Sequence, residues 1–209
     1  SANGDELVEA GGTPTASQKI NSNSNSIAAQ VLEAGALPVM LGIAVDSREQ
    51  TRKKIMAGLK SDIIITSGGV SVGDKDHVKE VIEELGGEIL FCKVNLKPGK
   101  PFAFAILRGK AIFALPGNPV AAMMVFEQFV RPALLKMMGH SDIFRARVKA
   151  TVTEGFSNKG DRPHLVLSRV SAEDGKYFVA ASADQNSSNL ALMLHTNSHF
   201  HLSGFHLQL

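Results

Sequence analysis

The chain has 209 residues, 44% of them hydrophobic, and its formal charge of +2 comes from 22 basic and 20 acidic side chains. A chain of this length and apolar content can bury a real core in one large or two modest domains. The near balance of charge gives no general attraction to nucleic acid or to a membrane surface, so basic groups must act locally. No apolar run approaches the length of a membrane span. We therefore expect neither nucleic acid nor a membrane as a partner.

A single cysteine, Cys92, excludes an internal disulfide framework and a cysteine-based structural zinc site. We expect its side chain to be buried as a small hydrophobe. A catalytic or redox role is the alternative, but no base for it is identifiable. A reducing, cytoplasmic setting fits this composition.

Up to about residue 141, helical and strand patterns alternate along the chain. We predict helices at 26–34, 48–59, 75–85 and 120–138, and strands at 37–45, 62–66, 88–94, 102–107 and 111–115. Pro132 favours a kink or break inside the long last helix. The alternation predicts an α/β fold with a doubly wound, mostly parallel sheet and right-handed crossovers. Ligands in such folds bind outside the carboxyl ends of the strands, so the loops after Val45, Thr66 and Leu115 should share one rim.

From about Phe144 the pattern changes to short alternating strands, which we predict at 145–153, 165–170 and 177–180. This predicts two domains, an α/β domain at 1–141 and a small β domain at 142–209. Near the end of the chain, His199 and His201 alternate with apolar residues and would share one strand face, which is compatible with metal binding. The alternative is a half-exposed strand or an atypical chain end, because no Asp, Glu or Cys lies close by in sequence.

The most informative segment is the glycine-rich stretch at 66–76, which follows a predicted strand and leads into a predicted helix. Small residues let the backbone approach a bulky ligand, and the N–H groups of a helix start attract negative charge. The candidate binding residues in it are Ser67, Gly68, Gly69, Ser71 and Gly73. Aspartates beside such a loop, Asp74 and Asp76, indicate a bridging divalent cation such as Mg²⁺. The alternative is an ordinary glycine-rich turn in which Asp76 caps the helix.

Two further motifs are expected on the same rim. Lys93, Lys97 and Lys100 surround a Pro-Gly turn, and three converging ammonium groups would suit an oxyanion such as phosphate. A solvated basic loop is the alternative. In the segment 115–119, Asn118 suits a helix cap and Pro119 the first helical position, so unpaired N–H groups would face the rim there too. As a lone motif, this segment is usually only a helix start.

Together, in this order and spacing, these motifs resemble the MoeA family of molybdopterin molybdenumtransferases, which includes the E domain of gephyrin. The motifs are Ser-Gly-Gly-Val-Ser-Val-Gly at 67–73, Lys-Pro-Gly-Lys-Pro-Phe at 97–102 and Leu-Pro-Gly-Asn-Pro-Val at 115–120. Asn-Gly-Asp-Glu-Leu at 3–7 is similar to the family's GDEL loop. The resemblance covers nearly the whole chain. It implies that residues 1–141 form a molybdopterin-binding domain of the MogA/MoeA type, followed by the small C-terminal β domain.

The resemblance implies a role in molybdenum cofactor biosynthesis, namely insertion of molybdate into adenylylated molybdopterin with metal-dependent release of AMP. By motif, the catalytic positions carried over are Glu6, Asp46, Asp76, Lys93 and Lys97. The remaining substrate-binding positions are Lys100, Pro116, Gly117, Asn118 and Pro119. We assign Asp46 and Asp76 to a Mg²⁺ ion over the pyrophosphate, and the lysines to phosphate or molybdate oxygens. The alternatives are that Asp46 only caps the helix that begins near Arg48, and that Glu6 is solvated.

The chain also departs from the family pattern. The family's two N-terminal domains, which drive dimerisation, have no counterpart, and we expect the strand before Gly4 to be missing and the β domain to be incomplete. We therefore expect a fragment that associates and is not a competent monomeric enzyme, and a homodimer for the full-length protein with a MogA-type adenylyltransferase upstream. Two other functions stay open: a MogA-type adenylyltransferase and a non-catalytic binding or scaffold module. The use of molybdate or tungstate is also open, because both are tetrahedral dianions of nearly equal size.

Overall fold

The computed structural model describes residues 2–4, 6–44, 47–69, 77–156 and 162–202. Its largest sheet has six strands in the order β4-β1-β5-β8-β7-β6. These strands are β1 (Ala2–Asn3), β4 (Ile43–Ala44), β5 (Ile63–Ser67), β6 (Glu88–Phe91), β7 (Ala103–Leu107) and β8 (Lys110–Leu115). Strands β4, β1, β5 and β8 are parallel, whereas β7 pairs antiparallel with both β8 and β6. The predicted α/β fold with a mostly parallel sheet is confirmed, with an antiparallel hairpin at one edge.

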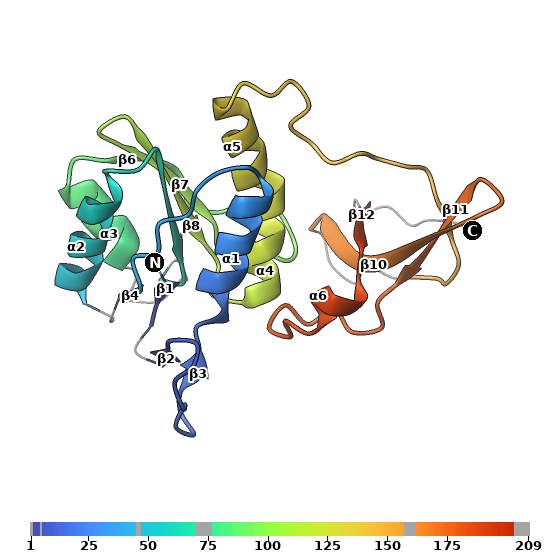
Figure 1. The fold of residues 1–209 in the computed structure, drawn as a ribbon, viewed down its shortest axis with the longest axis horizontal. Coiled ribbons are helices and arrows are strands. Elements are labelled where there is room, and N and C mark those ends of the chain that lie inside the picture. The colour runs from blue at the N-terminus through green and yellow to red at the C-terminus, as the bar shows by residue number, and fades with distance from the viewer. Residues whose placement is uncertain (1, 5, 45–46, 70–76, 157–161, 203–209) are drawn as a thin grey trace.

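Helices cover both faces of this sheet (Figure 1). One face carries α1 (Ser22–Glu33) and the long helical segment α4 (Pro119–Val125), η1 (Phe126–Val130) and α5 (Arg131–Met137); the other carries α2 (Arg48–Gly58) and α3 (His77–Glu84). Side chains along β8 alternate between the two cores: Phe113 packs with α1 and α4, and Ile112 packs with α2 and α3. Because both faces of β8 are buried, its sequence is a continuous apolar run, as expected for the central strand of a doubly wound sheet.

Three predictions for the N-terminal part of the chain differ from the structure. The strand expected at 37–45 is reduced to β4, because β4 pairs only with the two residues of β1, and Leu37 is 89% exposed. The strand expected to be missing before Gly4 is represented by β1, which lies between β4 and β5. Helix α1 starts four residues earlier than predicted, since the side chain of Asn21 caps it by accepting a hydrogen bond from the Ser24 amide.

The long helix that contains Pro132 is continuous but changes its winding. A π-helical segment, η1, precedes the proline, and the Arg131 amide donates to the carbonyl oxygen of Phe126, five residues earlier. Proline has no N–H to donate and its ring crowds the preceding turn, and a wider turn relieves both constraints. The predicted irregularity is therefore present, as a π-helical turn and not as a break.

A second sheet has the strand order β12-β10-β11-β9. Its strands are β9 (Thr151–Val152), β10 (His164–Glu173), β11 (Lys176–Ala181) and β12 (Ser198–Leu202), with the short helix α6 (Leu192–His195) before β12. The strand expected at 145–153 is wrong except at 151–152, because only these two residues pair with a strand within the described part of the chain. A small apolar cluster that includes Val120 of α4 and Leu165 of β10 packs the two sheet systems together. A two-stranded parallel sheet, β2 (Leu7–Val8) and β3 (Lys19–Ile20), completes the fold.

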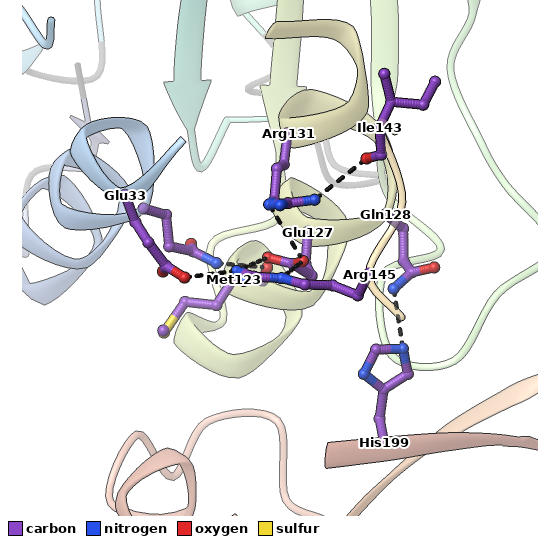
Figure 2. Close-up of polar contacts among 9 residues, drawn as sticks. Glu33, Met123, Glu127, Gln128, Arg131, Ile143, Arg145 and His199 are labelled. Atoms are coloured by element: carbon purple, nitrogen blue, oxygen red, sulfur yellow. Dashed lines mark hydrogen bonds and ion pairs between the residues drawn. The ribbon is translucent and has the colours of Figure 1, made fainter. Parts of the chain in front are cut away.

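The segment between α5 and β9 is exposed over nearly all of its residues from 139 to 149. It is attached at Arg145, whose guanidinium donates to Glu127 Oε1 and Glu33 Oε1, both at 2.7 Å (Figure 2). The Arg131 guanidinium donates to the carbonyl oxygen of Ile143 at 3.2 Å. Exposed backbone between two packed units is typical of a linker.

We expect limited trypsin digestion to cut this linker before any other site, and to cut after Arg147 and Lys149 before Arg145. Ion pairs with Glu33 of α1 and Glu127 of η1 hold the Arg145 side chain, whereas Arg147 and Lys149 are exposed in the linker. Mass spectrometry of the denatured digest would identify the cuts. First cleavage inside the six-stranded sheet would contradict the predicted boundary between residues 141 and 142.

Three smaller expectations can be compared with the described residues. Cys92 is exposed, so the prediction of a buried side chain is wrong; it follows the edge strand β6, which has little cover. His199 Nε2 lies 3.0 Å from Gln128 Nε2 of η1, and the described residues contain no cluster of three metal-ligating side chains (Figure 2). No helix within the described ranges is both long and apolar enough to cross a bilayer.

Candidate functional site

A cleft of about 1030 Å³ lies at the carboxyl ends of β1, β5 and β8. Its walls come from the loops after these three strands, the lysine turn after β6, the start of α1, and two segments beside β10 and β11 of the second sheet. Among the described residues, the predicted site positions that line it are Glu6, Ser67, Gly68, Gly69, Lys97, Lys100, Pro116, Gly117, Asn118 and Pro119. The expectation of a shared rim is therefore confirmed for the loops after β5 and β8. The third loop in that expectation, after Val45, begins outside the described residues.

Other predicted site positions are not placed in this cleft. Asp46, Asp76, Ser71 and Gly73 lie outside the described residues. Lys93 is exposed and does not line the cleft, so the expected convergence of three lysines is limited to Lys97 and Lys100. The reason is the course of the chain after β6, since Lys93 is four residues before the turn that borders the cleft.

The loops after β5 and β8 are joined by hydrogen bonds at the point where they line the cleft. The Gly68 amide donates to the carbonyl oxygen of Leu115 at 3.1 Å, and Ser67 Oγ donates to that of Pro116 at 3.0 Å. Gly68 and Gly69 have φ values of 82° and 70°, a region that favours glycine. A Cβ added at Gly117 would lie 3.7 Å from the Cα of Gly68, so the two loops run close together.

The lysine turn is held by the second sheet. The Lys97 amide donates to the carbonyl oxygen of Pro163 at 2.9 Å, and the Leu165 amide donates to that of Lys97 at 2.8 Å. These bonds form an isolated parallel bridge between Lys97 and His164. The main chain of Lys97 is therefore fixed, while its side chain is exposed at the cleft.

Among the described residues, the wall of the cleft carries more positive than negative side chains. Its described cationic residues are Lys19, Lys97, Lys100 and Arg162, and Glu6 is the one carboxylate that lines it within the described ranges. The helix α4 also starts here, with Asn118 at its N-cap and Pro119 in its first turn. Asn118 Nδ2 donates to Ser187 Oγ at 3.1 Å, and the Val120 amide donates to the carbonyl oxygen of Ser187 at 3.0 Å. The expectation of unpaired N–H groups at this helix start is therefore wrong for Val120, whose N–H is paired with the second sheet's loop. The arrangement suits a ligand that carries several negative charges.

The sequence leaves two alternatives open for the acidic residues: that Asp46 caps helix α2, and that Glu6 is solvated. The N-cap of α2 is Ser47, whose Oγ accepts a hydrogen bond from the Gln50 amide at 3.2 Å. The alternative that Asp46 serves as this cap is therefore wrong. Glu6 is exposed, which fits the solvated alternative, and it also borders the cleft.

Sequence reasoning missed the cleft residues of the second sheet and the start of α1. These are Asn23, Arg162, His164, Gln185, Ser187 and Ser188. Arg162 precedes β10 and His164 is its first residue. The apolar pattern of this strand is visible in the sequence, but its pairing with the lysine turn is not. A basic residue directly before a predicted strand was the available signal.

His164 is 3% exposed, and its Nδ1 has no hydrogen-bond partner among the described residues. Burial above all, together with the positive charges of Lys97 and Arg162, lowers the pKa of His164 from 6.5 to about 4. The imidazole is therefore neutral in the folded protein near neutral pH.

We expect this histidine to make folding less stable in acid. Between pH values of about 6.5 and 4 the unfolded chain binds a proton at this residue and the folded chain does not, so stability falls as the pH falls through this window. The loss should be roughly 1–3 kcal/mol. Urea unfolding of the parent and of His164→Gln at several pH values would measure it. Equal pH dependence in the two proteins would contradict the expectation, since all other groups are common to both.

The structure is an α/β domain followed by a small β sheet, with a cleft at the carboxyl ends of its parallel strands. Residues 2–136 match the family model described as a probable molybdopterin binding domain, and the chain belongs to this family.

Two curated relatives carry the name molybdopterin molybdenumtransferase. The one from Nostoc sp. is 33% identical over 204 residues, which cover 93% of this chain and 46% of the relative. The one from Haemophilus influenzae is 39% identical over 137 residues, which cover 65% of this chain and 34% of the relative. The resemblance to the MoeA family is confirmed. The chain spans about half the length, or less, of these relatives.

A solved structure supports the fold over both sheets. It is the molybdopterin biosynthesis MoeA protein from Pyrococcus horikosii, with a TM-score of 0.82 and 23% sequence identity. The match covers 97% of this chain and 49% of that chain. The fold of this chain, an α/β domain followed by a β unit, is thus that of a MoeA protein.

Proposed function

We propose that the chain forms part of an enzyme that inserts molybdate into adenylylated molybdopterin and releases AMP. The observation that carries the proposal is the positively charged cleft at the carboxyl ends of β1, β5 and β8, lined by both glycine loops and by Lys97 and Lys100. The names of the curated relatives supply the pterin and the metal transfer. A substrate that holds a pyrophosphate group matches the charge of this wall.

The residues would divide the work as follows. The loop amides after β5 and β8, other than that of Gly68, which donates to Leu115, and the ammonium groups of Lys97 and Lys100 would bind phosphate and molybdate oxygens. Water or a molybdate oxygen would attack the phosphorus of the AMP group, and the bond between the two phosphates would break. No nucleophilic side chain is then required. The two dithiolene sulfurs of the pterin would displace one oxo group of molybdate, which would leave as water with the two thiol protons, so that molybdenum would keep its oxidation state.

Asp46 and Asp76 are proposed to hold Mg²⁺, which would offset the charge of the pyrophosphate. Carboxylate oxygens are the donors that this ion prefers, and Ser47 leaves Asp46 without a capping role. Glu6 stays in the proposal as an active-site residue by resemblance and lines the cleft, whereas Lys93 matches the family by motif alone and does not line it. A homodimer of the full-length protein, a MogA-type adenylyltransferase as supplier of the substrate, and a cytoplasmic location are proposed on the same ground. So is the division into domains at 1–141 and 142–209.

The test is Mg²⁺-dependent AMP release from adenylylated molybdopterin in the presence of molybdate. The assay is run on this chain and on a polypeptide that also supplies the half of the relatives that this chain does not match. AMP release by the longer polypeptide supports the proposal. Tight binding without AMP release would favour a non-catalytic module, and ATP-dependent formation of the adenylylated pterin would favour the adenylyltransferase.

A further inference from the structure

Asn23 lies in the first turn of α1 and is 8% exposed. It is not the helix cap, because Asn21 performs that role. Asparagine is a poorer helix former than alanine, and its Oδ1 is buried without a hydrogen-bond partner among the described residues. Neither helix formation nor packing explains why an amide stands at this position.

The amide of Asn23 joins the two loops that line the cleft. Its Nδ2 donates to Ser67 Oγ at 2.7 Å and to the carbonyl oxygen of Gly117 at 2.8 Å. Ser67 Oγ in turn donates to the carbonyl oxygen of Pro116. One side chain from α1 therefore spans the loop after β5 and the loop after β8, and both of its N–H groups are used.

We propose that Asn23 is a positioning residue of this site, which holds the two loops at the spacing that phosphate binding requires. The inference rests on the proposed function. Asn23 acts through Ser67 and Gly117, because its own oxygen is buried and its N–H groups are engaged. Loop amides bind an oxyanion only if several of them point at it together, so their relative placement decides affinity.

The test uses magnesium pyrophosphate as the probe and calorimetry as the measurement. Asn23→Leu keeps the branched shape of the side chain and removes its donors, and Asn23→Ala removes both the branch and the donors. Asn25→Ala is the matched control, since Asn25 is exposed in the same turn of α1. We expect both Asn23 variants to bind the probe about tenfold more weakly, equivalent to about 1.4 kcal/mol. Asn25→Ala should bind as the parent does.

Two further readouts separate positioning from a general loss of structure. Amide hydrogen exchange of the ligand-free protein should quicken at Gly68 in Asn23→Leu, while amides in the α2 and α3 core keep their protection. A double-mutant cycle with Ser67→Ala should be non-additive in probe affinity, because Asn23 is proposed to act through Ser67.

The outcomes distinguish the two proposals. If Asn23→Leu binds the probe as the parent does while Lys97→Ala binds it more weakly, the positioning role is overturned and the proposed function stands. If the parent itself does not bind the probe, the proposed function fails. In that case amide hydrogen exchange is the one remaining test of whether Asn23 holds the two loops. Unchanged protection of the Gly68 amide in Asn23→Leu overturns that role.

Discussion

Replacing Gly99 by alanine should destabilise the protein by about 2–4 kcal/mol. Gly99 has a φ of 118°, and an added Cβ would lie 2.5 Å from Val125 Cγ2, which is too close for any real contact. Val125 is fully buried in α4 and cannot move aside without disturbing the core. The lysine turn would have to move away from the helix. Urea unfolding would measure the loss.

Gly109→Ala is the matched control for backbone strain. Gly109 has a φ of 75° in the turn between β7 and β8, and an added Cβ there meets nothing within 4 Å. It should cost about 1–2 kcal/mol, from the backbone alone. The difference between the two variants isolates the contact with Val125. Equal losses would show that the contact with Val125 adds no cost, which would contradict the expectation.

The elements that the sequence predicted well have signals within a few residues. Helix α2 begins at Arg48 as predicted, because a capping serine precedes a helical pattern. The hairpin of β7 and β8 follows from two apolar runs separated by Arg108 and Gly109, both with positive φ. The loop after β5 is recognisable by its glycines and the turn at Lys97 by its prolines and lysines, and both line the cleft.

The failures come from partners that are distant in sequence. An apolar run such as Leu37 to Leu41 suits a strand, but a strand forms only where a neighbour offers hydrogen bonds along its length. Lys93 lies on the same segment as Lys97, and only the pairing of Lys97 with β10 decides which of them reaches the cleft. Local pattern carries no information on that pairing.

The residues that the second sheet and its loops add to the cleft could not be predicted from the sequence. Gln185 illustrates the reason: its side chain accepts from the Leu167 amide and donates to the Leu167 carbonyl oxygen, both at 2.9 Å. A side chain here takes the place of a neighbouring strand and fixes the loop that contains Ser187. Nothing in the local sequence distinguishes this glutamine from a solvated one.

Lys97→Ala should weaken the binding of magnesium pyrophosphate by roughly tenfold to a hundredfold, the scale of a lost charge-assisted contact at about 1–3 kcal/mol. The substitution is clean, because two backbone hydrogen bonds to β10 hold the main chain of Lys97 whatever its side chain. Lys97→Arg should retain most of the affinity, since it keeps the charge. Calorimetry at two salt concentrations measures the effect, and added salt should reduce it.

Lys93→Ala is the control that shows whether a lysine must line the cleft to affect binding, or whether a match to the family motif is enough. Both lysines match the family's functional positions by motif, but only Lys97 lines the cleft. The two substitutions remove the same charge from positions four residues apart, so long-range electrostatics contribute similarly to both. We expect Lys93→Ala to weaken binding by less than about threefold, since exposed charges interact weakly across solvent. Equal losses for the two variants would place the anion outside the cleft, between the two side chains, because only there could both ammonium groups contact it.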